Sequence, residues 1–185
     1  MQISAVPSAS IIELRILKTM GLVCLLSCYT PTLIAEVNAE KNYRINKITD
    51  STYVSGQPSV NDFALLKQLK IQNIISFRPP SEHPQINEAE IASQYQMAFY
   101  TIPIDTPEQI TYERVATLEQ ILTSLNQEPT LMHCASGNRV GAMMTAHAYW
   151  FRGQNLEDAL KTGERYGLTR WRGDIEKLLL QYRLQ

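Results

Sequence analysis

The chain has 185 residues, 44% of them hydrophobic, and a formal net charge of −1 at pH 7. This length allows one domain with a proper core and is hardly enough for two. The balanced charge, together with aromatic residues that are scattered without a stacking pattern, gives no reason to expect nucleic acid or an anionic membrane surface as a partner.

Residues 1–39 have the features of a targeting segment. Two basic residues precede an apolar run, Met20–Cys28, which is too short to cross a membrane comfortably but suits the apolar core of a signal peptide. A signal-peptide cleavage site fits at the end of the segment. Residues 25–28 also resemble a lipobox, with an unusual second Leu. An uncleaved membrane anchor and a later true start of translation are further alternatives. We therefore expect an exported protein, periplasmic or tethered to the membrane by an N-terminal lipid or anchor, with one domain over residues 40–185.

The rest of the chain alternates between short apolar strands and amphipathic helices. Phe63, Leu66 and Leu69 have the spacing of one helix face, for example, and the compact apolar run that follows them is stopped by two prolines. Such alternation predicts an α/β fold with a central, mainly parallel sheet and helices on both faces. In chain order we expect strands over 43–48 and 53–55, a helix over 61–69, a strand over 71–77, a helix over 87–96, a strand over 98–104, a helix over 111–126, a strand over 130–134, a helix over 140–151 and two further helical stretches.

The sequence His-Cys-Ala-Ser-Gly-Asn-Arg, residues 133–139, lies where the last predicted strand turns into a helix. Ligands of parallel α/β sheets bind at this edge, beyond the carboxyl ends of the strands. The backbone amides of such a loop converge on one point, Gly137 permits the turn that this needs, and Arg139 supplies a planar fork of donors for a tetrahedral oxyanion. We therefore expect the following residues to bind an anionic group: Ala135, Ser136, Gly137, Asn138 and Arg139.

Cys134 begins this loop, where the same positive field favours the thiolate, the reactive nucleophile. The other two cysteines lie in the apolar N-terminal stretch, so neither an internal disulfide nor a cysteine-based metal cluster is expected in the folded part. The alternative is a buried structural cysteine, since free Cys is among the most buried residue types. That alternative explains neither Gly137 nor a cation at a helix N-terminus, where the dipole repels it.

Four motifs occur in an order and spacing that resemble a bacterial phosphatase-like family, the beta-lactamase hydrolase-like proteins, which is related to the Cys-based tyrosine and dual-specificity phosphatases. They are Tyr53–Pro58, Ile74–Pro79 followed by Glu82, Tyr100–Pro103 and Cys134–Arg139. The resemblance implies the fold of those phosphatases and a phosphomonoester hydrolase in which Cys134 forms a phosphocysteine. It also implies a phosphorylated protein or small molecule as substrate and no metal or organic cofactor.

The resemblance further implies roles for residues outside the loop. Asp105 follows a core strand where the general acid of such phosphatases lies, with Glu108 in reserve; the alternative is that Asp105 or Thr106 merely caps a turn. Arg78 follows another strand end, where it either lines the pocket or pairs with Glu82. Gln57 is placed to reach the loop from a neighbouring strand, which makes Gln57 and Arg78 candidate substrate-binding residues.

Two departures leave other reactions open. Four residues separate Cys134 from Arg139, whereas dual-specificity phosphatases have five, and Val140 replaces the hydroxyl residue that usually follows the arginine. The shorter loop also resembles that of rhodanese sulfurtransferases, in which the cysteine carries a persulfide, although His133 and the motifs of Gln57 and Arg78 favour the phosphatase-like side. A sulfurtransferase using a Cys134 persulfide and a non-catalytic oxyanion-binding module are therefore the alternatives. The three histidines lack the spacing of metal ligands, so no metal site is expected.

Overall fold

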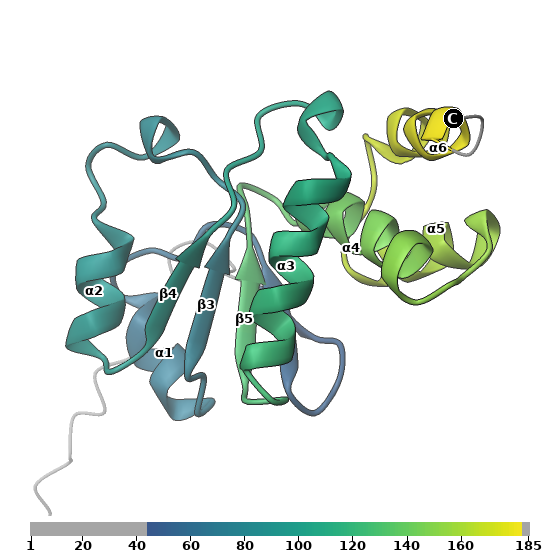
Figure 1. The fold of residues 1–185 in the computed structure, drawn as a ribbon. Coiled ribbons are helices and arrows are strands. Elements are labelled where there is room, and N and C mark those ends of the chain that lie inside the picture. Colours follow the sequence, from purple (N-terminus) through teal and green to yellow (C-terminus); the bar gives the residue numbers. More distant parts are fainter. Residues whose placement is uncertain (1–43, 183–185) are drawn as a thin grey trace, which may run out of the picture. The chain divides into compact units, whose positions relative to one another are not determined.

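The structure, a computed structural model, describes residues 44–182, which belong to one compact unit (Figure 1). The predicted targeting segment and the first residue of the strand predicted over 43–48 lie outside the described residues. In the part of the chain that is described, no helix has the length and apolar character needed to cross a membrane.

Five strands form one sheet in the order β1-β2-β5-β3-β4. The first two strands are antiparallel and the remaining neighbours are parallel, which confirms the predicted mainly parallel sheet. Ser55 and Ser76 both lie opposite His133, so the strands that flank β5 end level with it. The strands are β1 (Ile45–Lys47), β2 (Thr52–Ser55), β3 (Asn73–Ser76), β4 (Ala98–Thr101) and β5 (Thr130–His133).

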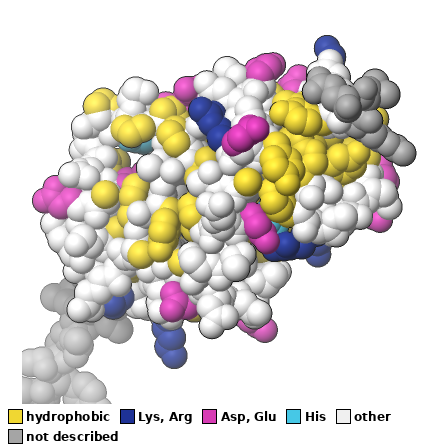
Figure 2. All heavy atoms as spheres, in the orientation of Figure 1, with side chains coloured by type: hydrophobic (Ala, Val, Ile, Leu, Met, Phe, Trp, Pro, Cys, Tyr) yellow, Lys and Arg dark blue, Asp and Glu magenta, His cyan; other side chains and the backbone are white. Residues whose placement is uncertain are grey.

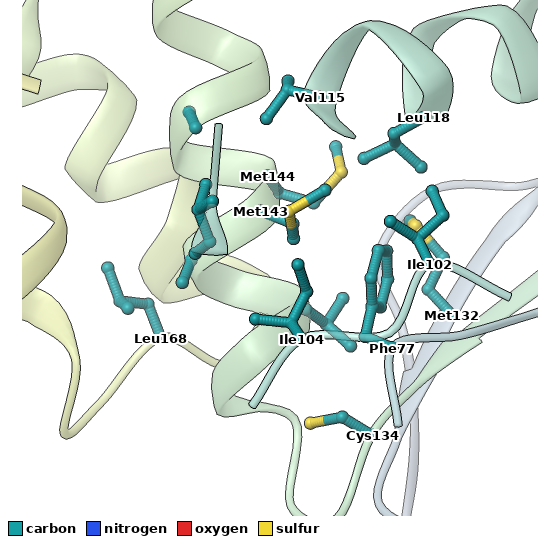
Figure 3. Packing of buried hydrophobic residues seen from close by; sticks show 14 of the residues in the cluster. Phe77, Ile102, Ile104, Val115, Leu118, Met132, Cys134, Met143, Met144 and Leu168 are labelled. Carbon is teal, nitrogen blue, oxygen red and sulfur yellow. The ribbon is translucent and has the colours of Figure 1, made fainter. Parts of the chain in front are cut away.

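Helices cover both faces of this sheet, as predicted (Figure 1). Alternate residues of a strand point to opposite faces: on β5, Leu131 packs in a cluster with the first two α-helices, whereas Met132 packs in a larger cluster with the later helices. Figure 3 shows part of that larger cluster, with Cys134 at its edge. The helices are α1 (Asp62–Gln68), α2 (Glu88–Gln94), α3 (Tyr112–Ser124), α4 (Asn138–Phe151), α5 (Leu156–Arg165) and α6 (Arg172–Tyr182), with two short 3₁₀ turns, η1 (Pro80–Glu82) and η2 (Pro107–Gln109).

Aromatic contacts join α3, α4 and α6 at one end. The ring of Tyr112 stacks on Phe151 with centroids 5.1 Å apart, and Trp150 meets Tyr182 edge to face at 5.0 Å. Tyr112 and Tyr182 keep about two fifths of their surface exposed (45% and 42%). Figure 2 shows hydrophobic side chains gathered at the upper right of the molecule, where these helices approach one another.

Helix α4 packs so closely on α5 and on the segment after α5 that two glycines at these contacts have no room for a side chain. A Cβ atom on Gly141 would overlap the backbone nitrogen of Leu168, and one on Gly163 would lie 2.8 Å from the carbonyl oxygen of Gly141. We therefore expect Gly141→Ala to lower the free energy of unfolding by about 3 kcal/mol, because the backbones must separate.

Gly173 in α6 is the matched control, since a Cβ atom there would meet nothing within 4 Å. Alanine favours a helix over glycine by about 1 kcal/mol, so Gly173→Ala should be neutral or slightly stabilising. Urea unfolding of the two variants measures the difference, and equal stabilities would contradict the tight packing.

Candidate active site

The predicted site residues follow strands that end at the same edge of the sheet. Gln57, Arg78 and Cys134 come directly or almost directly after β2, β3 and β5, whose last residues are level with one another. Beyond the end of β4 the chain stays in the core through Ile104, whose amide donates to the carbonyl of Phe77, and Asp105 comes next. The topology thus brings the four segments that carry these residues to one edge, as expected for a ligand site of a parallel sheet.

Cys134 is 1% exposed, and its sulfur accepts a hydrogen bond of 3.1 Å from the amide of Gly137. Gly137 itself has a φ of +90°, a left-handed conformation that side chains disfavour. It is also the N-cap of α4, and within residues 44–182 no side chain caps the first amides of the helix. The loop therefore offers uncapped amide donors beside the sulfur, which is an anion-binding arrangement.

The end of β2 fits closely against this loop. A Cβ atom on Gly56 would lie 3.0 Å from the carbonyl oxygen of Ala135, tighter than side chains normally approach a backbone oxygen. Glycine at this position therefore lets β2 and the loop touch. The segment after β2 is in this way held beside Cys134.

Arg139 forms a two-point ion pair with Glu82. Its Nη1 and Nη2 donate to the two carboxylate oxygens at 3.1 and 2.5 Å, and Arg78 Nε donates to the same carboxylate at 2.9 Å. The hydrogen bonds from Arg139, more than those from Arg78, hold the pKa of Glu82 below its usual value although partial burial opposes them.

This pairing occupies only one edge of the Arg139 guanidinium. Among the described residues Nε of Arg139 has no hydrogen-bond partner, so the edge formed by Nε and one Nη remains available to an oxyanion. Glu82 therefore positions the Arg139 side chain and leaves a binding edge on it. Of the two alternatives that the sequence left open for Arg78, the structure shows the pair with Glu82; the pair between Glu82 and Arg139 was not predicted.

Polar contacts also link Arg78, through Gln57 and Glu88, to His133. Gln57 accepts from Arg78 Nη1 at 2.5 Å and donates to Glu88 at 2.8 Å. Glu88 Oε1 lies 3.2 Å from Nε2 of His133, within ion-pair range, although the ring is not oriented for a hydrogen bond. Burial opposes ionisation of Glu88, but His133 and then Gln57 hold its pKa below the usual value. Gln57 and Arg78 thus connect the residue before Cys134 with the partner of Arg139.

The side chain of Asn138 has a structural role. It is 3% exposed, and its oxygen accepts from the amide and hydroxyl of Thr169 and from the amide of Trp171. Asn138 can therefore serve the predicted anion site through its backbone amide, while its side chain ties the loop to the segment between α5 and α6. Gly167 of that segment also packs on the loop, since a Cβ atom there would lie 3.2 Å from the carbonyl oxygen of Gly137.

Asp105 is exposed, and among the described residues its carboxylate has no hydrogen bond or ion pair. Its amide donates to Oε1 of Gln109 at 2.7 Å, and Arg114 donates to the backbone carbonyl of the same glutamine at 3.2 Å, which shapes the loop. At the start of η2 the structure shows no side-chain cap from Thr106. A hydrogen bond from the Thr106 side chain holds the pKa of Glu108 low, which makes Glu108 a poorer proton donor than an unconstrained carboxyl. Asp105 stays the predicted acid.

Within residues 44–182, no three His, Cys, Asp or Glu side chains gather to hold a metal ion. Anion binding by loop amides and Arg139, next to a cysteine sulfur, is the chemistry that the edge supports.

The chain is similar to known phosphatases at low sequence identity. No protein-family model matches the chain. The dual specificity protein phosphatase TpbA of Pseudomonas aeruginosa strain UCBPP-PA14 is 22% identical over 129 residues, which cover 69% of this chain and 56% of that protein. The chain thus spans about half the length of the curated relatives it matches.

Solved structures give the same picture of the fold. The crystal structure of P. aeruginosa TpbA superposes with a TM-score of 0.55 and 18% identity, covering 73% of this chain and 84% of that one. A second structure of TpbA, in complex with pTyr, superposes with a TM-score of 0.53 and 18% identity, covering 75% of this chain and 90% of that one. A structure of kinase associated phosphatase superposes with a TM-score of 0.63 and 18% identity, covering 78% of this chain and 96% of that one. The chain therefore has the fold of the Cys-based tyrosine and dual-specificity phosphatases, and the predicted resemblance to that group is confirmed.

Proposed function

We propose that this chain is a Cys-dependent phosphatase, a phosphomonoester hydrolase that works through a phosphocysteine on Cys134. The observation that carries the proposal is the loop at the end of β5, in which the sulfur faces the Gly137 amide and Glu82 fixes Arg139 with one edge available. The fold of Cys-based phosphatases and the relationship to TpbA support it. A phosphorylated protein or small molecule is the proposed substrate, in line with the pTyr complex of TpbA.

The proposed reaction has two displacements at phosphorus. In the first, the Cys134 thiolate attacks, the P–O bond to the leaving group breaks, and Asp105 gives its proton to the leaving oxygen. In the second, water attacks the phosphocysteine, Asp105 takes a proton from it, and the thiolate leaves as inorganic phosphate forms. The loop amides and Arg139 stabilise the charge on the non-bridging oxygens in both steps.

Val140 is fully buried beside the site and has no hydroxyl to assist the departing sulfur. We therefore expect the second displacement to limit turnover. The wild type should release p-nitrophenolate from p-nitrophenyl phosphate in a burst of about one equivalent per chain before steady state. Acid quenching during the burst, followed by mass spectrometry, should find one phosphoryl group on the peptide that contains Cys134.

The same protein distinguishes the alternatives. A wild type that hydrolyses no phosphate ester but releases thiocyanate from thiosulfate and cyanide would replace the proposal with a sulfurtransferase. Tight binding of phosphate with turnover of neither substrate would replace it with an oxyanion-binding module.

Replacing Asp105 with asparagine tests the proposed acid. Asp105→Asn should lower kcat/KM, which reports the first displacement, about 10²-fold for an alkyl phosphate such as phosphoserine, because an alkoxide leaves poorly without a proton. The loss should be smaller for p-nitrophenyl phosphate, whose leaving group is stable as an anion. Glu108→Gln, three residues away on the same loop, should retain wild-type rates with both substrates. If the two variants behave alike, Asp105 is not the acid.

Glu82 is the proposed positioning residue for Arg139. Glu82→Gln should lower kcat/KM about 10- to 100-fold, since an amide cannot hold the guanidinium by two charge-assisted bonds and a misplaced donor costs transition-state stabilisation. Glu90→Gln is the control, because Glu90 lies on the exposed start of α2 and accepts from the side chain of Asn87. Unchanged kinetics for Glu82→Gln would show that the ion pair has no part in the reaction.

We also propose export, on the strength of the apolar run in residues 1–39. Fractionation of cells that produce the full chain should place it in the periplasm or at the membrane, and a chain that begins at residue 40 should stay in the cytoplasm. Identical distribution of the two forms would overturn this.

A further inference from the structure

A cavity of about 290 Å³ lies at the edge of the sheet opposite Cys134. It opens between the first residues of β2 and β5, the end of α3, and the helices α4 and α5. Thr52 and Thr130, which begin the two strands, line it, whereas Cys134 follows the other end of β5. The cavity is therefore separate from the proposed active site.

Much of the lining is apolar and comes from the hydrophobic core. Leu125, Met132 and Met144 are at most 6% exposed and yet line this space. The size is at the lower end of the range of small-molecule pockets, about 300–1,000 Å³. An apolar molecule of modest size would bury its surface against these three side chains.

The polar lining supplies one cation without a counter-ion. Arg165 forms no ion pair among the described residues, and its Nη2 reaches only the hydroxyl of Thr162, at 3.5 Å. Arg152 also lines the cavity, but Glu119 accepts from both of its terminal nitrogens, at 3.0 and 2.7 Å. The acidic group of the lining, Glu128, accepts from Asn73 at 3.1 Å. Because Asn73 is neutral, Glu128 keeps its negative charge, and Arg165 is the group of the lining that an incoming anion can use.

Neutral hydrogen-bonding groups stand next to Arg165. Thr162 donates to the side chain of Gln154 at 2.9 Å, and both residues line the cavity. Tyr166 lines the cavity as well. Burial raises the pKa of its phenol, so Tyr166 presents a neutral hydroxyl group. A guanidinium beside hydroxyl and amide groups suits a carboxylate head.

The backbone at the cavity is held in an uncommon conformation. Asn126 and Gln127 both have positive φ values, 46° and 63°, and Gln127 belongs to the lining. Non-glycine residues seldom adopt this conformation, and glutamine is not one of those enriched in it. Asn126 follows the C-cap of α3, where a left-handed residue commonly ends a helix, as Lys70 and Gln96 do after α1 and α2.

We propose that this cavity binds a small amphipathic anion, with a carboxylate head at Arg165 and an apolar body of about six to ten carbons between α3, α4 and β5. This binding site is independent of the phosphatase activity. Met132 and Met144, in its wall, report on occupancy directly, whereas Met97 packs in the cluster on the opposite face of the sheet.

The test is a titration of the full chain, labelled with ¹³C on the methionine methyl groups, with sodium octanoate. Saturating inorganic phosphate is present throughout, so that the loop of Cys134 does not take up the carboxylate. The methyl signals of Met132 and Met144, assigned by single Met→Leu variants, should shift saturably with a Kd of about 1 mM or lower, while that of Met97 stays in place. Octylamine, of equal length and opposite charge, should bind at least about tenfold more weakly.

Arg165→Gln should weaken octanoate binding about tenfold, because the carboxylate loses the cation that, among the described residues of the lining, has no carboxylate partner. Arg170→Gln is the matched control, since Arg170 is exposed and does not line the cavity. Either substitution lies on the surface and leaves the fold intact. The proposal is overturned if Met132 and Met144 do not respond, if octylamine binds as tightly, or if Arg165→Gln changes nothing. None of these outcomes bears on hydrolysis at Cys134.

Discussion

The Cys134→Ser variant should hydrolyse p-nitrophenyl phosphate at least about 10⁴ times more slowly than the wild type. Serine fills nearly the same volume in a position that is 1% exposed, so the loop should keep its shape and the Gly137 amide should donate to the new oxygen. What disappears is the thiolate, and a serine hydroxyl with no adjacent base is a poor nucleophile. Steady-state rates at saturating substrate give the ratio.

The control for this variant comes from the same chain. Cys24 lies in the apolar N-terminal run, and replacing it with serine should leave the rate unchanged. Cys134→Ser should still bind phosphotyrosine by calorimetry, because the loop amides and Arg139 remain. A variant that retains a tenth of the wild-type rate would exclude Cys134 as the nucleophile.

Arg139→Lys should lower kcat/KM about 10²- to 10³-fold, which is the usual cost of removing one transition-state donor. Lysine keeps the charge but not the planar fork, so it cannot hold Glu82 with two bonds and still offer a second edge to the phosphoryl oxygens. Kinetics with p-nitrophenyl phosphate measure the loss.

Arg152→Lys is a close structural match as a control. Arg152 forms the same kind of two-point pair, with Glu119, in a part of the fold away from Cys134. Its replacement should leave kcat/KM at the wild-type value. The double variant Glu82→Gln/Arg139→Lys should lose less than the product of the single losses, because both changes break one interaction. Strictly multiplicative losses would contradict a shared role.

The location of the site could be predicted because it depends on local pattern and on one topological rule. Apolar periodicity marks each strand, and the ends of parallel strands share an edge, which is enough to bring Gln57, Arg78 and Cys134 to the same place. The Arg78–Glu82 pair is four residues apart in sequence, so it too lies within reach of local reasoning.

The contacts that organise the site could not be predicted in this way. Glu82 meets Arg139 across 57 positions, and Asn138 meets Thr169 across 31. Such pairs depend on which strands are neighbours and on how the loops beyond them run, and the sequence pattern does not specify either. A glycine such as Gly167 can indicate that two backbones approach closely. Nothing near Gly167 in the sequence, however, identifies Gly137 as the residue that it approaches.

Element ends differ from prediction for physical reasons. The strands predicted over 71–77 and 98–104 contain apolar residues that are buried, but only Asn73–Ser76 and Ala98–Thr101 pair in the ladder. Helix α4 begins at Asn138, two residues before the predicted start, because Gly137 turns the chain directly into the helix. Arg139 is therefore in the first helical turn, where the dipole disfavours a cation, and the carboxylate of Glu82 compensates for this.

The strand order has a consequence for how the protein folds as it is synthesised. β5 is the last strand in the chain, yet it lies in the middle of the sheet, with β2 on one side and β3 on the other. A nascent chain that ends before residue 130 can therefore form only two separate ladders, β1 with β2 and β3 with β4. Each has an open edge that invites pairing with other chains. Insertion of β5 closes both edges in one non-local step, so we expect slow, late folding in which the sheet and the nucleophile loop are completed together.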